Sequence, residues 1–358
     1  MGKQTVVVGM SGGVDSSVAA YLLKEQGYDV IGVTMQIWQA EDQCSISDHG
    51  GCCGLSAVED ARNVASQLHI PHYVMNFRSE FEKYVIDYFV DEYERGRTPN
   101  PCIACNRFIK WESLLSRSVA IGADAIATGH YARIDKLANG RFCIRTSATA
   151  QKDQTYALYN LTQEQLSRTK MPVGEYTKEE IRTIARQLGL QVADKPDSQE
   201  ICFVPDRDYA GFISKKTKKQ YPPGNFVSTD GRVLGRHQGI IHYTVGQRKG
   251  LGLAVGHPVF VTAIVPERNE VVIGEDADVW GDTLQAVCLN WMAIEQPAEE
   301  ISCVAKIRYS HAGAPCRVRM VGNDRMECRF EEPVRAITPG QAVVLYDGEY
   351  VLGGGVIL

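Results

Sequence analysis

The stretch Gly9–Ser17 constrains this chain more than any other part of its sequence. It follows the apolar run Thr5–Val8 and leads into a helical pattern that continues to Gln26. Glycines after a strand let backbone N–H groups approach an anion, and the start of the next helix adds positive partial charge. An ordinary strand-to-helix turn is the plainer interpretation of two glycines. The complete string S-G-G-V-D-S-S instead favours a phosphate-binding loop.

The loop contains no lysine, so it does not match the Walker sequence G-x-x-x-x-G-K-[ST]. Its pattern S-G-G-x-D-S resembles the pyrophosphatase (PP) loop of enzymes that split ATP into AMP and pyrophosphate. This resemblance implies adenylation of a carbonyl oxygen, which activates the carbon for substitution. Asp15 is a candidate to help hold Mg²⁺, with turn or cap chemistry as its alternative role.

The chain has 358 residues, enough for two or three domains, and a composition typical of a soluble globular protein. No apolar run reaches the length of a membrane span. The sequence begins directly with a strand pattern, and its eleven cysteines have no regular spacing. We therefore expect a cytoplasmic protein with mostly reduced thiols and no membrane partner.

The formal net charge of −5 does not suggest nucleic-acid binding, but the charge is unevenly distributed. Between Gly211 and Phe260 the only acid is Asp230, and basic residues outnumber it. These are Lys215, Lys216, Lys218, Lys219, Arg232, Arg236, Arg248 and Lys249. Such a segment is usually only a solvated face, but it also suits a polyanionic partner such as RNA.

The first half of the chain alternates strand and helix patterns. Strands are predicted at Thr5–Gly9, Asp29–Met35, His72–Asn76 and Ala125–Thr128. Helices are predicted at Ser16–Gln26, Ser56–Leu68, Phe81–Glu94, Asn106–Ala120 and Thr177–Leu188, with capping boxes that start at Ser56 and Thr177. This alternation predicts a parallel sheet covered on both faces, with ligands at the carboxyl ends of its strands. Met35 and Gly129-His130 should therefore lie beside the loop.

After about Pro205 the helical periodicity gives way to short β-type runs. They are Val259–Val265, Glu270–Ile273, Val304–Tyr309, Cys316–Met320 and Ala342–Leu345. The last part of the chain has the strand density of a barrel or sandwich. We expect a catalytic α/β domain at residues 1–205, a small basic β-rich domain at 206–277 and a β-barrel domain at 278–358.

Three cysteines differ from the others in their surroundings. Cys102 and Cys105 follow a rigid Pro-Asn-Pro turn at a helix start, where the dipole favours thiolate, and Cys202 lies in a polar loop. The cysteines in β-like runs are predicted to be small buried hydrophobic residues; these are Cys143, Cys288, Cys303, Cys316 and Cys328. Cys44, Cys52 and Cys53 lack the paired spacing that zinc prefers, so a flexible substrate-side loop is favoured there.

The chain resembles the bacterial tRNA-specific 2-thiouridylases of the MnmA type over nearly its whole length. The matching strings are Gly9–Ser17, Thr98–Asn106, Ala127–Tyr131, Lys152–Gln154, Asp197–Phe203, Gly246–Gly252, Arg308-Tyr309 and Thr338–Gln341. The family places 2-thiouridine at the tRNA wobble position. The resemblance implies a PP-loop α/β domain, a small central domain and a C-terminal β-barrel.

The resemblance also implies roles for individual residues. ATP-binding positions would be Gly9, Met10, Ser11, Gly12, Gly13, Val14, Asp15, Ser16, Met35 and Gly129. Positions that contact the target base or the tRNA would be Asn100, Pro101, Cys102, His130, Lys152, Asp153, Gln154, Arg308, Tyr309 and Gln341. From the residues alone, Arg308-Tyr309 is predicted to be an exposed pair on a β-strand. Implied partners are tRNAs with Lys, Glu and Gln acceptors and a cysteine desulfurase or relay protein, with the enzyme as a monomer.

Two sulfur chemistries remain open for the three distinctive cysteines. In the first, which the resemblance implies, Cys202 carries a persulfide sulfur and Cys105 is the nucleophile that ends as the resolving thiol. In the second, Cys102, Cys105 and Cys202 hold a [4Fe–4S] cluster with one open iron. The second arises because many family members carry Asp where this chain has Cys102. Cys102 is therefore either an accessory residue or a cluster ligand.

Two other functions compete with thiolation. An amidotransferase-type synthetase would use the same loop, but amination does not require thiols at positions 105 and 202. A non-catalytic RNA-binding or sulfur-carrying protein would use ATP only as a structural ligand. Normal turnover after Cys202→Ser would favour the first, and AMP release that tRNA does not stimulate would favour the second.

Overall fold

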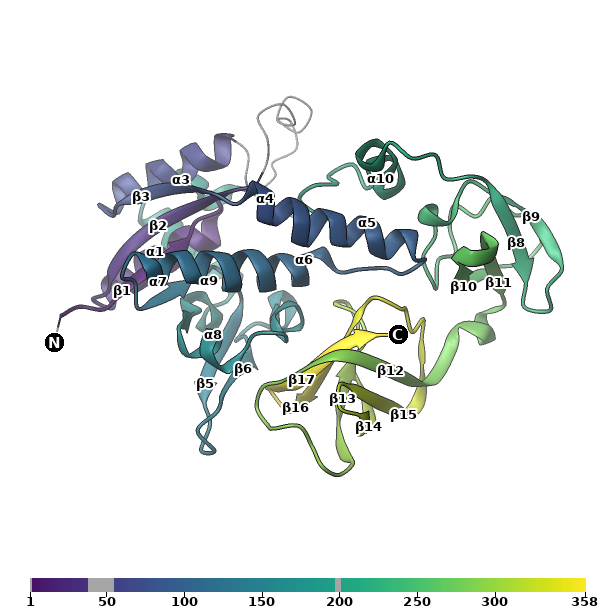
Figure 1. Cartoon of the computed structure of the whole chain (residues 1–358). Helices are drawn as coiled ribbons and strands as arrows, with labels where there is room; N and C mark the ends of the chain where they lie inside the picture. The colour runs from purple at the N-terminus through teal and green to yellow at the C-terminus, as the bar shows by residue number, and fades with distance from the viewer. Residues whose placement is uncertain (1, 38–54, 197–200) are drawn as a thin grey trace. The chain divides into compact units, whose positions relative to one another are not determined.

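The computed structural model describes residues 2–37, 55–196 and 201–358 (Figure 1). The chain forms two compact units, each built from segments that are distant in sequence. The first comprises Met1–Val85, Cys102–Pro205 and Glu349–Val351. The second comprises Ile86–Pro101, Asp206–Gly348 and Leu352–Leu358. Among the described residues, no helix combines the length and the apolar character that crossing a membrane requires.

The first unit contains a five-stranded sheet in the order β3-β2-β1-β4-β7, in which every pair is parallel. Its strands are β1 (Thr5–Gly9), β2 (Asp29–Gln36), β3 (His72–Asn76), β4 (Ala125–Ala127) and β7 (Thr169–Lys170). The predicted parallel sheet is confirmed, although β4 ends one residue earlier than expected and β7 was not predicted. Gly9 pairs with Val33, so the glycine-rich loop begins at the carboxyl edge of the sheet.

Helices cover both faces of this sheet. The helices of the first unit include α1 (Val14–Glu25), α3 (Leu55–Gln67), α4 (Arg78–Phe81), α7 (Leu115–Ala120), α8 (Gln163–Ser167) and α9 (Lys178–Gln187). Val6 and Val8 join the core formed with α1, α3 and α9. Val7 and Ile126 are fully buried as well but lie outside that core, because side chains alternate along a strand. The strand β1 is therefore covered on both faces, which explains why the run before the loop is continuously apolar.

Two long helical runs are interrupted by wider π-helical turns. One continues from α4 through Glu82–Ile86 into α5 (Asp87–Glu94), and the other from α6 (Pro101–Ala104) through Cys105–Leu114 into α7. The capping box at Thr177 is present at the start of α9. The one predicted at Ser56 is wrong, because α3 begins at Leu55 and Ser56 is already inside the helix. Short 3-10 turns of the first unit are Ala150–Lys152, Thr155–Leu158, Pro172–Glu175 and Gln191–Asp194.

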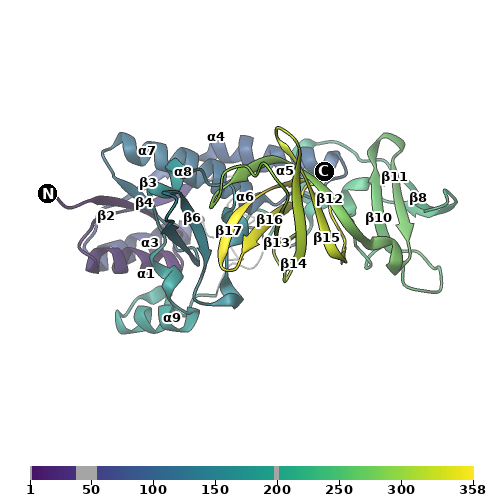
Figure 2. The same ribbon diagram turned by 90° about the horizontal axis from the view of Figure 1, so that it is seen from below.

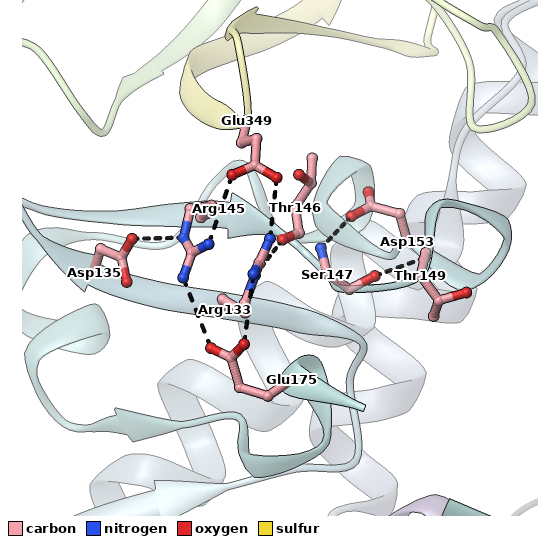
Figure 3. A network of polar contacts seen from close by, with 9 residues as sticks. All are labelled: Arg133, Asp135, Arg145, Thr146, Ser147, Thr149, Asp153, Glu175 and Glu349. Atoms are coloured by element: carbon pink, nitrogen blue, oxygen red, sulfur yellow. Dashed lines mark hydrogen bonds and ion pairs between the residues drawn. The ribbon is translucent and has the colours of Figure 1, made fainter. Parts of the chain in front are cut away.

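The first unit also contains an antiparallel hairpin that the sequence analysis missed, β5 (Ala132–Lys136) and β6 (Phe142–Thr146). Its two half-buried arginines, Arg133 and Arg145, lie between carboxylates, as Figure 3 shows. Arg133 reaches Glu175 at 3.5 Å and Glu349 at 3.2 Å, and Arg145 reaches Asp135 at 2.6 Å. The backbone N–H of Thr146 donates to the Glu349 carbonyl at 2.8 Å. These contacts explain why Glu349–Val351 belongs to the first unit.

The second unit contains a four-stranded sheet, the helices α5 and α10, and a barrel. The sheet has the order β10-β11-β8-β9, with β8 (Gly224–Ser228), β9 (Val233–His237), β10 (Phe260–Val265) and β11 (Glu270–Gly274). Helix α10 spans Tyr209–Thr217, and 3-10 turns lie at Ile240–His242, Pro266–Arg268 and Asp276–Val279. All eight residues of the basic segment named above are exposed. Two of them are neutralised locally, Lys219 by Glu94 and Arg232 by Asp230.

The C-terminal strands form a closed barrel (Figures 1 and 2). They are β12 (Trp280–Trp291), β13 (Ile301–Lys306), β14 (Ala314–Gly322), β15 (Arg325–Arg335), β16 (Ala342–Asp347) and β17 (Tyr350–Ile357). Their order is β12-β15-β14-β13-β16-β17, and β12 also pairs with β17. This last pairing closes the sheet, so the tail is a barrel rather than a sandwich and the predicted fold class is confirmed.

Candidate active site

The glycine-rich loop is held in shape by the hydroxyl groups of its own serines. The backbone N–H of Ser11 donates to Ser16 Oγ at 3.2 Å, and Ser16 Oγ donates to the Gly13 carbonyl at 3.2 Å. Ser17 Oγ donates to the same carbonyl at 2.8 Å. α1 begins at Val14, and the Gly13 carbonyl also accepts from Ser17 N at 3.3 Å, so the serine hydroxyls reinforce the first turn of the helix. The three serines of the motif therefore determine the local shape of the loop.

Two glycines allow other segments to approach this loop closely. Gly12 has φ +70°, and a Cβ there would lie 2.4 Å from the carbonyl oxygen of Ala57. A Cβ at Gly129 would lie 2.6 Å from Ser16 N. Gly129 follows β4, so the structure brings it against the first turn of α1, as the carboxyl-edge rule predicts. No side chain larger than hydrogen fits at either position without a backbone shift.

Met35 and Met10 belong to the same edge of the sheet. Thr34 Oγ1 donates to the Met10 carbonyl at 2.9 Å, and Met10 N donates to the Val33 carbonyl at 2.8 Å. Met10 is buried, whereas Met35 is half-buried near the end of β2. The predicted ATP-binding residues thus gather at one edge, with buried and half-buried loop residues and a half-buried thioether beside them.

Asp15 and Gly12 contact lysines that the sequence analysis did not single out. Asp15 accepts from Lys178 Nζ at 2.7 and 2.8 Å and from the Tyr131 hydroxyl at 2.7 Å. Lys195 Nζ donates to the Gly12 carbonyl at 3.2 Å. A Mg²⁺ ion bound at Asp15 would therefore share this carboxylate with the Lys178 ammonium group and the Tyr131 hydroxyl.

His130 lies beside this edge in a neutral form. Lys110 Nζ lies 3.3 Å from His130 Nε2, and Thr128 Oγ1 lies 2.7 Å from His130 Nδ1. Because an ammonium group only donates, we assign the ring proton to Nδ1. Burial, and secondarily the charge of Lys110, hold the pKa of His130 well below its usual range. His130 is thus a hydrogen-bonding group and not a cation in this arrangement.

The predicted tRNA-contacting residues Lys152, Asp153 and Gln154 follow the hairpin β5–β6. Asp153 accepts from Ser147 N at 2.9 Å (Figure 3) and from Thr155 N at 3.2 Å. Gln154 exchanges two hydrogen bonds with the backbone of Tyr131, at 2.9 and 3.0 Å. The side chains of Asp153 and Gln154 therefore fasten this loop, and their contact with tRNA stays a prediction.

The three distinctive cysteines occupy different local structures. Cys102 is exposed in the first turn of the helical run that begins at Pro101, and Cys105 is half-buried where the π-helical turns begin. Cys202 is half-buried in a turn, followed by the buried Phe203, whose ring packs edge-on against Phe81 at 6.0 Å. π-helical turns are frequent at functional sites. Within the described part of the chain, no three His, Cys, Asp or Glu side chains form a group that could hold a metal ion.

The other cysteines follow the prediction of buried hydrophobic residues only in part. Cys143, Cys316 and Cys328 are buried, and Cys303 is half-buried with its Sγ 3.6 Å from that of Cys316. For Cys288 the prediction is wrong: it is exposed and has φ +54°, because β12 is irregular between Val287 and Asn290. The predicted substrate-side loop with Cys44, Cys52 and Cys53 lies outside the described residues.

In the second unit, the segment Thr98–Pro101 is held by residues from the end of the barrel. Thr98 N donates to the Pro339 carbonyl at 2.9 Å. Gln341 Nε2 donates to the carbonyls of Thr98, at 2.8 Å, and Pro99, at 3.3 Å. This segment contains Asn100 and Pro101, which the family resemblance places at the target base. The Gln341 amide therefore holds the segment Thr98–Pro101, and the contacts of this segment and of Gln341 with tRNA stay predictions.

The prediction that Arg308-Tyr309 lies on a β-strand is wrong. β13 ends at Lys306, and the pair lies in the bend and turn that follow. Arg308 Nη1 donates to the Arg335 carbonyl at 2.9 Å, and Tyr309 is 51% exposed. After β13 the chain reverses direction to form the antiparallel strand β14, and the residues that make this turn include Gly313. An exposed aromatic ring in a turn suits stacking on a base.

The parallel sheet, with its glycine loop against Gly129, defines a nucleotide-binding α/β protein with two appended β-structures. Residues 4–206 match the family described as tRNA methyl transferase HUP domain. Residues 210–275 match the tRNA methyl transferase PRC-barrel domain, and residues 281–357 the aminomethyltransferase beta-barrel domain. The class is therefore that of HUP-domain proteins with a central PRC-type barrel and a C-terminal β-barrel.

Similarity to curated relatives identifies the family. The chain is 68% identical over 353 residues to the tRNA-specific 2-thiouridylase MnmA of Lachnoclostridium phytofermentans, covering 99% of each chain. It is 56% identical over 358 residues to the protein of that name from Acetivibrio thermocellus, covering 100% of each. The chain belongs to the tRNA-specific 2-thiouridylase family. Among solved structures, NMN synthetase from Francisella tularensis matches with a TM-score of 0.34 and 16% identity, over 61% of this chain and 78% of that chain.

Proposed function

We propose that this protein is an ATP-dependent tRNA uridine 2-sulfurtransferase that converts the wobble uridine of tRNA into 2-thiouridine. One observation carries the proposal. The glycine loop is held by serine hydrogen bonds and packs against Gly129, and it lies in a chain that matches 2-thiouridylases over 99–100% of their length. The loop supplies the ATP site, and the cysteines at positions 102, 105 and 202 supply thiols that an amination reaction does not need.

The first step activates the base. The uracil carbonyl oxygen is a poor leaving group, so it attacks the α-phosphorus of ATP and pyrophosphate leaves. Backbone N–H groups at Gly9–Ser17 and the start of α1 stabilise the phosphate charge. Mg²⁺, when bound with ATP, neutralises phosphate charge and orients the displacement. The adenylated oxygen is now a good leaving group, and it departs as part of AMP when sulfur attacks in the second step.

The second step delivers sulfur. A terminal persulfide sulfur on Cys202 attacks the activated carbon, and the bond from that carbon to the adenylated oxygen breaks. The thiolate of Cys105 then attacks Cys202 Sγ, and the sulfur–sulfur bond to the base breaks with its electron pair going to the 2-thio group. A Cys105–Cys202 disulfide remains. A dithiol reductant returns the two thiols, and a new sulfur atom is loaded on Cys202.

The partners follow from this chemistry. A cysteine desulfurase or a sulfur-relay protein charges Cys202. The tRNAs are those with Lys, Glu and Gln acceptors, bound by one monomer in the cytoplasm, with His130, Lys152, Arg308 and Tyr309 among the contacts. The basic segment suits the tRNA backbone, because its eight cations are all exposed. The functional division into residues 1–205, 206–277 and 278–358 belongs to the same proposal.

An anaerobic thiolation assay tests the proposal. Purified protein is incubated with unmodified tRNA, ATP–Mg²⁺ and either a charging desulfurase with cysteine or free sulfide. Nucleoside mass spectrometry measures 2-thiouridine, and iron is quantified in the same preparation. Thiolation without iron is expected. Cys105→Ser and Cys202→Ser should abolish it, whereas Cys288→Ser, which changes an exposed thiol on the barrel, should match the wild type.

Other outcomes discriminate between the alternatives. Thiolation that follows the iron content and accepts free sulfide would make Cys102, Cys105 and Cys202 cluster ligands in place of the persulfide relay. Normal turnover by Cys202→Ser would point to another adenylating enzyme. AMP release that does not respond to tRNA would point to a binding protein. No 2-thiouridine under either sulfur source would overturn the proposed function.

A further inference from the structure

We propose that Lys178 and Lys195 are the residues that bind the polyphosphate of ATP at the loop Gly9–Ser17. The inference rests on the proposed use of ATP and deepens it. It assigns the positive charge of the site to two residues that lie more than 160 positions away from the loop in the sequence.

The loop itself lacks the charge that its ligand requires. Gly9–Ser17 contains no Lys or Arg, and its one charged residue, Asp15, is negative. The start of a helix contributes only about half of an elementary charge. A triphosphate carries several negative charges, and the pyrophosphate that leaves must be stabilised as its charge develops. Cations from elsewhere in the chain have to supply the difference.

Lys178 places its ammonium group at the first turn of α1. It is the first residue of α9, and its Nζ lies 2.7 and 2.8 Å from the two oxygens of Asp15. The side chain is 13% exposed, and its Nζ lies 5.8 Å from the centre of the Tyr131 ring. Tyr131 also donates to Asp15, at 2.7 Å. Packing of α9 on α1 therefore keeps a cation beside Ser16 and Gly129.

Lys195 places a second ammonium group at the tip of the loop. Its Nζ lies 3.2 Å from the carbonyl oxygen of Gly12 and 2.8 Å from Asp60 Oδ2. Gly12 is the residue with φ +70°, so the cation lies at the sharpest bend of the loop. The Lys195 and Asp60 side chains are 28% and 30% exposed. A polyanion that enters the loop therefore reaches this ammonium group without passing through the core.

The carboxylates of Asp15 and Asp60 compensate the charges of the two lysines before ATP binds, and the Gly12 carbonyl also positions Lys195. Each ammonium group is compensated, so neither is a lone cation in a half-buried position. When the phosphates arrive, they provide a stronger set of charge-assisted acceptors for the same donors. Lys24 offers a contrast within the same helix: it lies in the last turn of α1, and its Nζ donates to the Leu68 carbonyl at 2.6 Å. Lys24 stabilises the fold away from the loop.

Equilibrium binding measured by calorimetry on the full chain tests the assignment. ATP, pyrophosphate and AMP are titrated into the wild type, Lys178→Gln, Lys195→Gln and the control Lys24→Gln, with thermal melts to verify folding. Loss of one charged contact should weaken ATP and pyrophosphate binding by roughly 10-fold to 100-fold in each loop variant. AMP binding should stay within about twofold, since AMP lacks the leaving phosphates. Lys24→Gln should bind all three ligands like the wild type.

Asp60→Asn separates phosphate binding from a purely structural ion pair. If Lys195 serves only to hold Asp60, then Asp60→Asn weakens ATP binding as much as Lys195→Gln does, and the proposal is overturned. If Lys195 binds phosphate, Asp60→Asn leaves ATP affinity unchanged or raises it, because a competing carboxylate is gone. This comparison also stands if Lys178→Gln fails to fold.

Two further results would be decisive. If the wild type binds ATP and both lysine variants bind it equally well, the assignment is overturned and the proposed function stands. The same conclusion follows if the lysine variants lose affinity for AMP as much as for ATP. A wild-type chain that binds neither ATP nor pyrophosphate would overturn the proposed function, and the assignment with it.

Discussion

The loop Gly9–Ser17 and the segment Thr98–Pro101 both lead into a helix, yet they are held in different ways. The loop is shaped by bonds among Ser11, Gly13, Ser16 and Ser17, all within seven residues. The segment Thr98–Pro101 receives its hydrogen bonds from Gln341, which is 243 positions away from Thr98. A local motif determines the first site, and the closure of the barrel determines the second.

This difference predicts how each region responds to change. A loop that is held by hydrogen bonds among its own residues should be sensitive to larger side chains at the few positions packed against it. Substitutions elsewhere should affect it little. A segment held from a distance is sensitive to the loss of single hydrogen bonds in the element that holds it. Three variants test this comparison, in order of decreasing expected effect.

Gly129→Ala should have the largest effect. Its Cβ would meet backbone atoms of Ser16 and Asp15 at 2.6 and 2.7 Å, so the first turn of α1 must move. Such a displacement of reacting groups costs on the order of 100-fold in rate, and overpacking costs about 1–3 kcal/mol of stability. The measurement is tRNA-dependent AMP release. Gly322→Ala is the control, because its Cβ would make only an ordinary 3.6 Å contact with Arg325. Equal AMP release by both variants would refute the steric role of Gly129.

Gln341→Ala should have a smaller effect that is confined to the tRNA reaction. It removes two hydrogen bonds to the carbonyls of Thr98 and Pro99, each worth about 0.5–1.5 kcal/mol. We expect kcat/KM for tRNA thiolation to fall about tenfold while ATP binding stays unchanged. Gln285→Ala, an exposed position on β12, is the control. A loss of ATP binding in Gln341→Ala would show that the two regions do not act separately.

His130 should contribute a modest pH dependence to stability. Its pKa is lowered in the folded state by burial and by Lys110, so folding favours the neutral ring. The stabilisation is present above the unfolded pKa of about 6.5 and is lost as pH falls through the lower folded value. His130→Gln should therefore lose less stability than the wild type between about pH 7.5 and pH 5.5, measured by urea midpoints. Identical slopes for the two proteins would contradict this.

The sequence predicted β1, β2 and β3 closely because each is a short run rich in β-branched or aromatic residues, and the runs of β1 and β2 are largely buried. β3 lies at the sheet edge with Tyr73 and Val74 exposed, and its local composition still identified it. The hairpin β5–β6 escaped notice although Asn139-Gly140 at its turn is a strong hairpin signal. Its strands carry Arg133, Asp135 and Arg145, which break the apolar pattern. The half-buried charges of the two arginines are compensated by Glu175 and Glu349, and Asp135 pairs with Arg145 (Figure 3).

The sequence by itself identified the glycine loop, the alternating α/β half and the three distinctive cysteines, because each of these features depends on a pattern of neighbouring residues. The tertiary structure decided which cations lie at the loop and what holds the segment Thr98–Pro101. Lys178, Lys195 and Gln341 have no local signature, since a lysine at a helix start or a glutamine before a strand is ordinary in any sequence. Their roles arise only when packing brings Nζ or Nε2 within hydrogen-bond distance of a distant backbone or carboxylate.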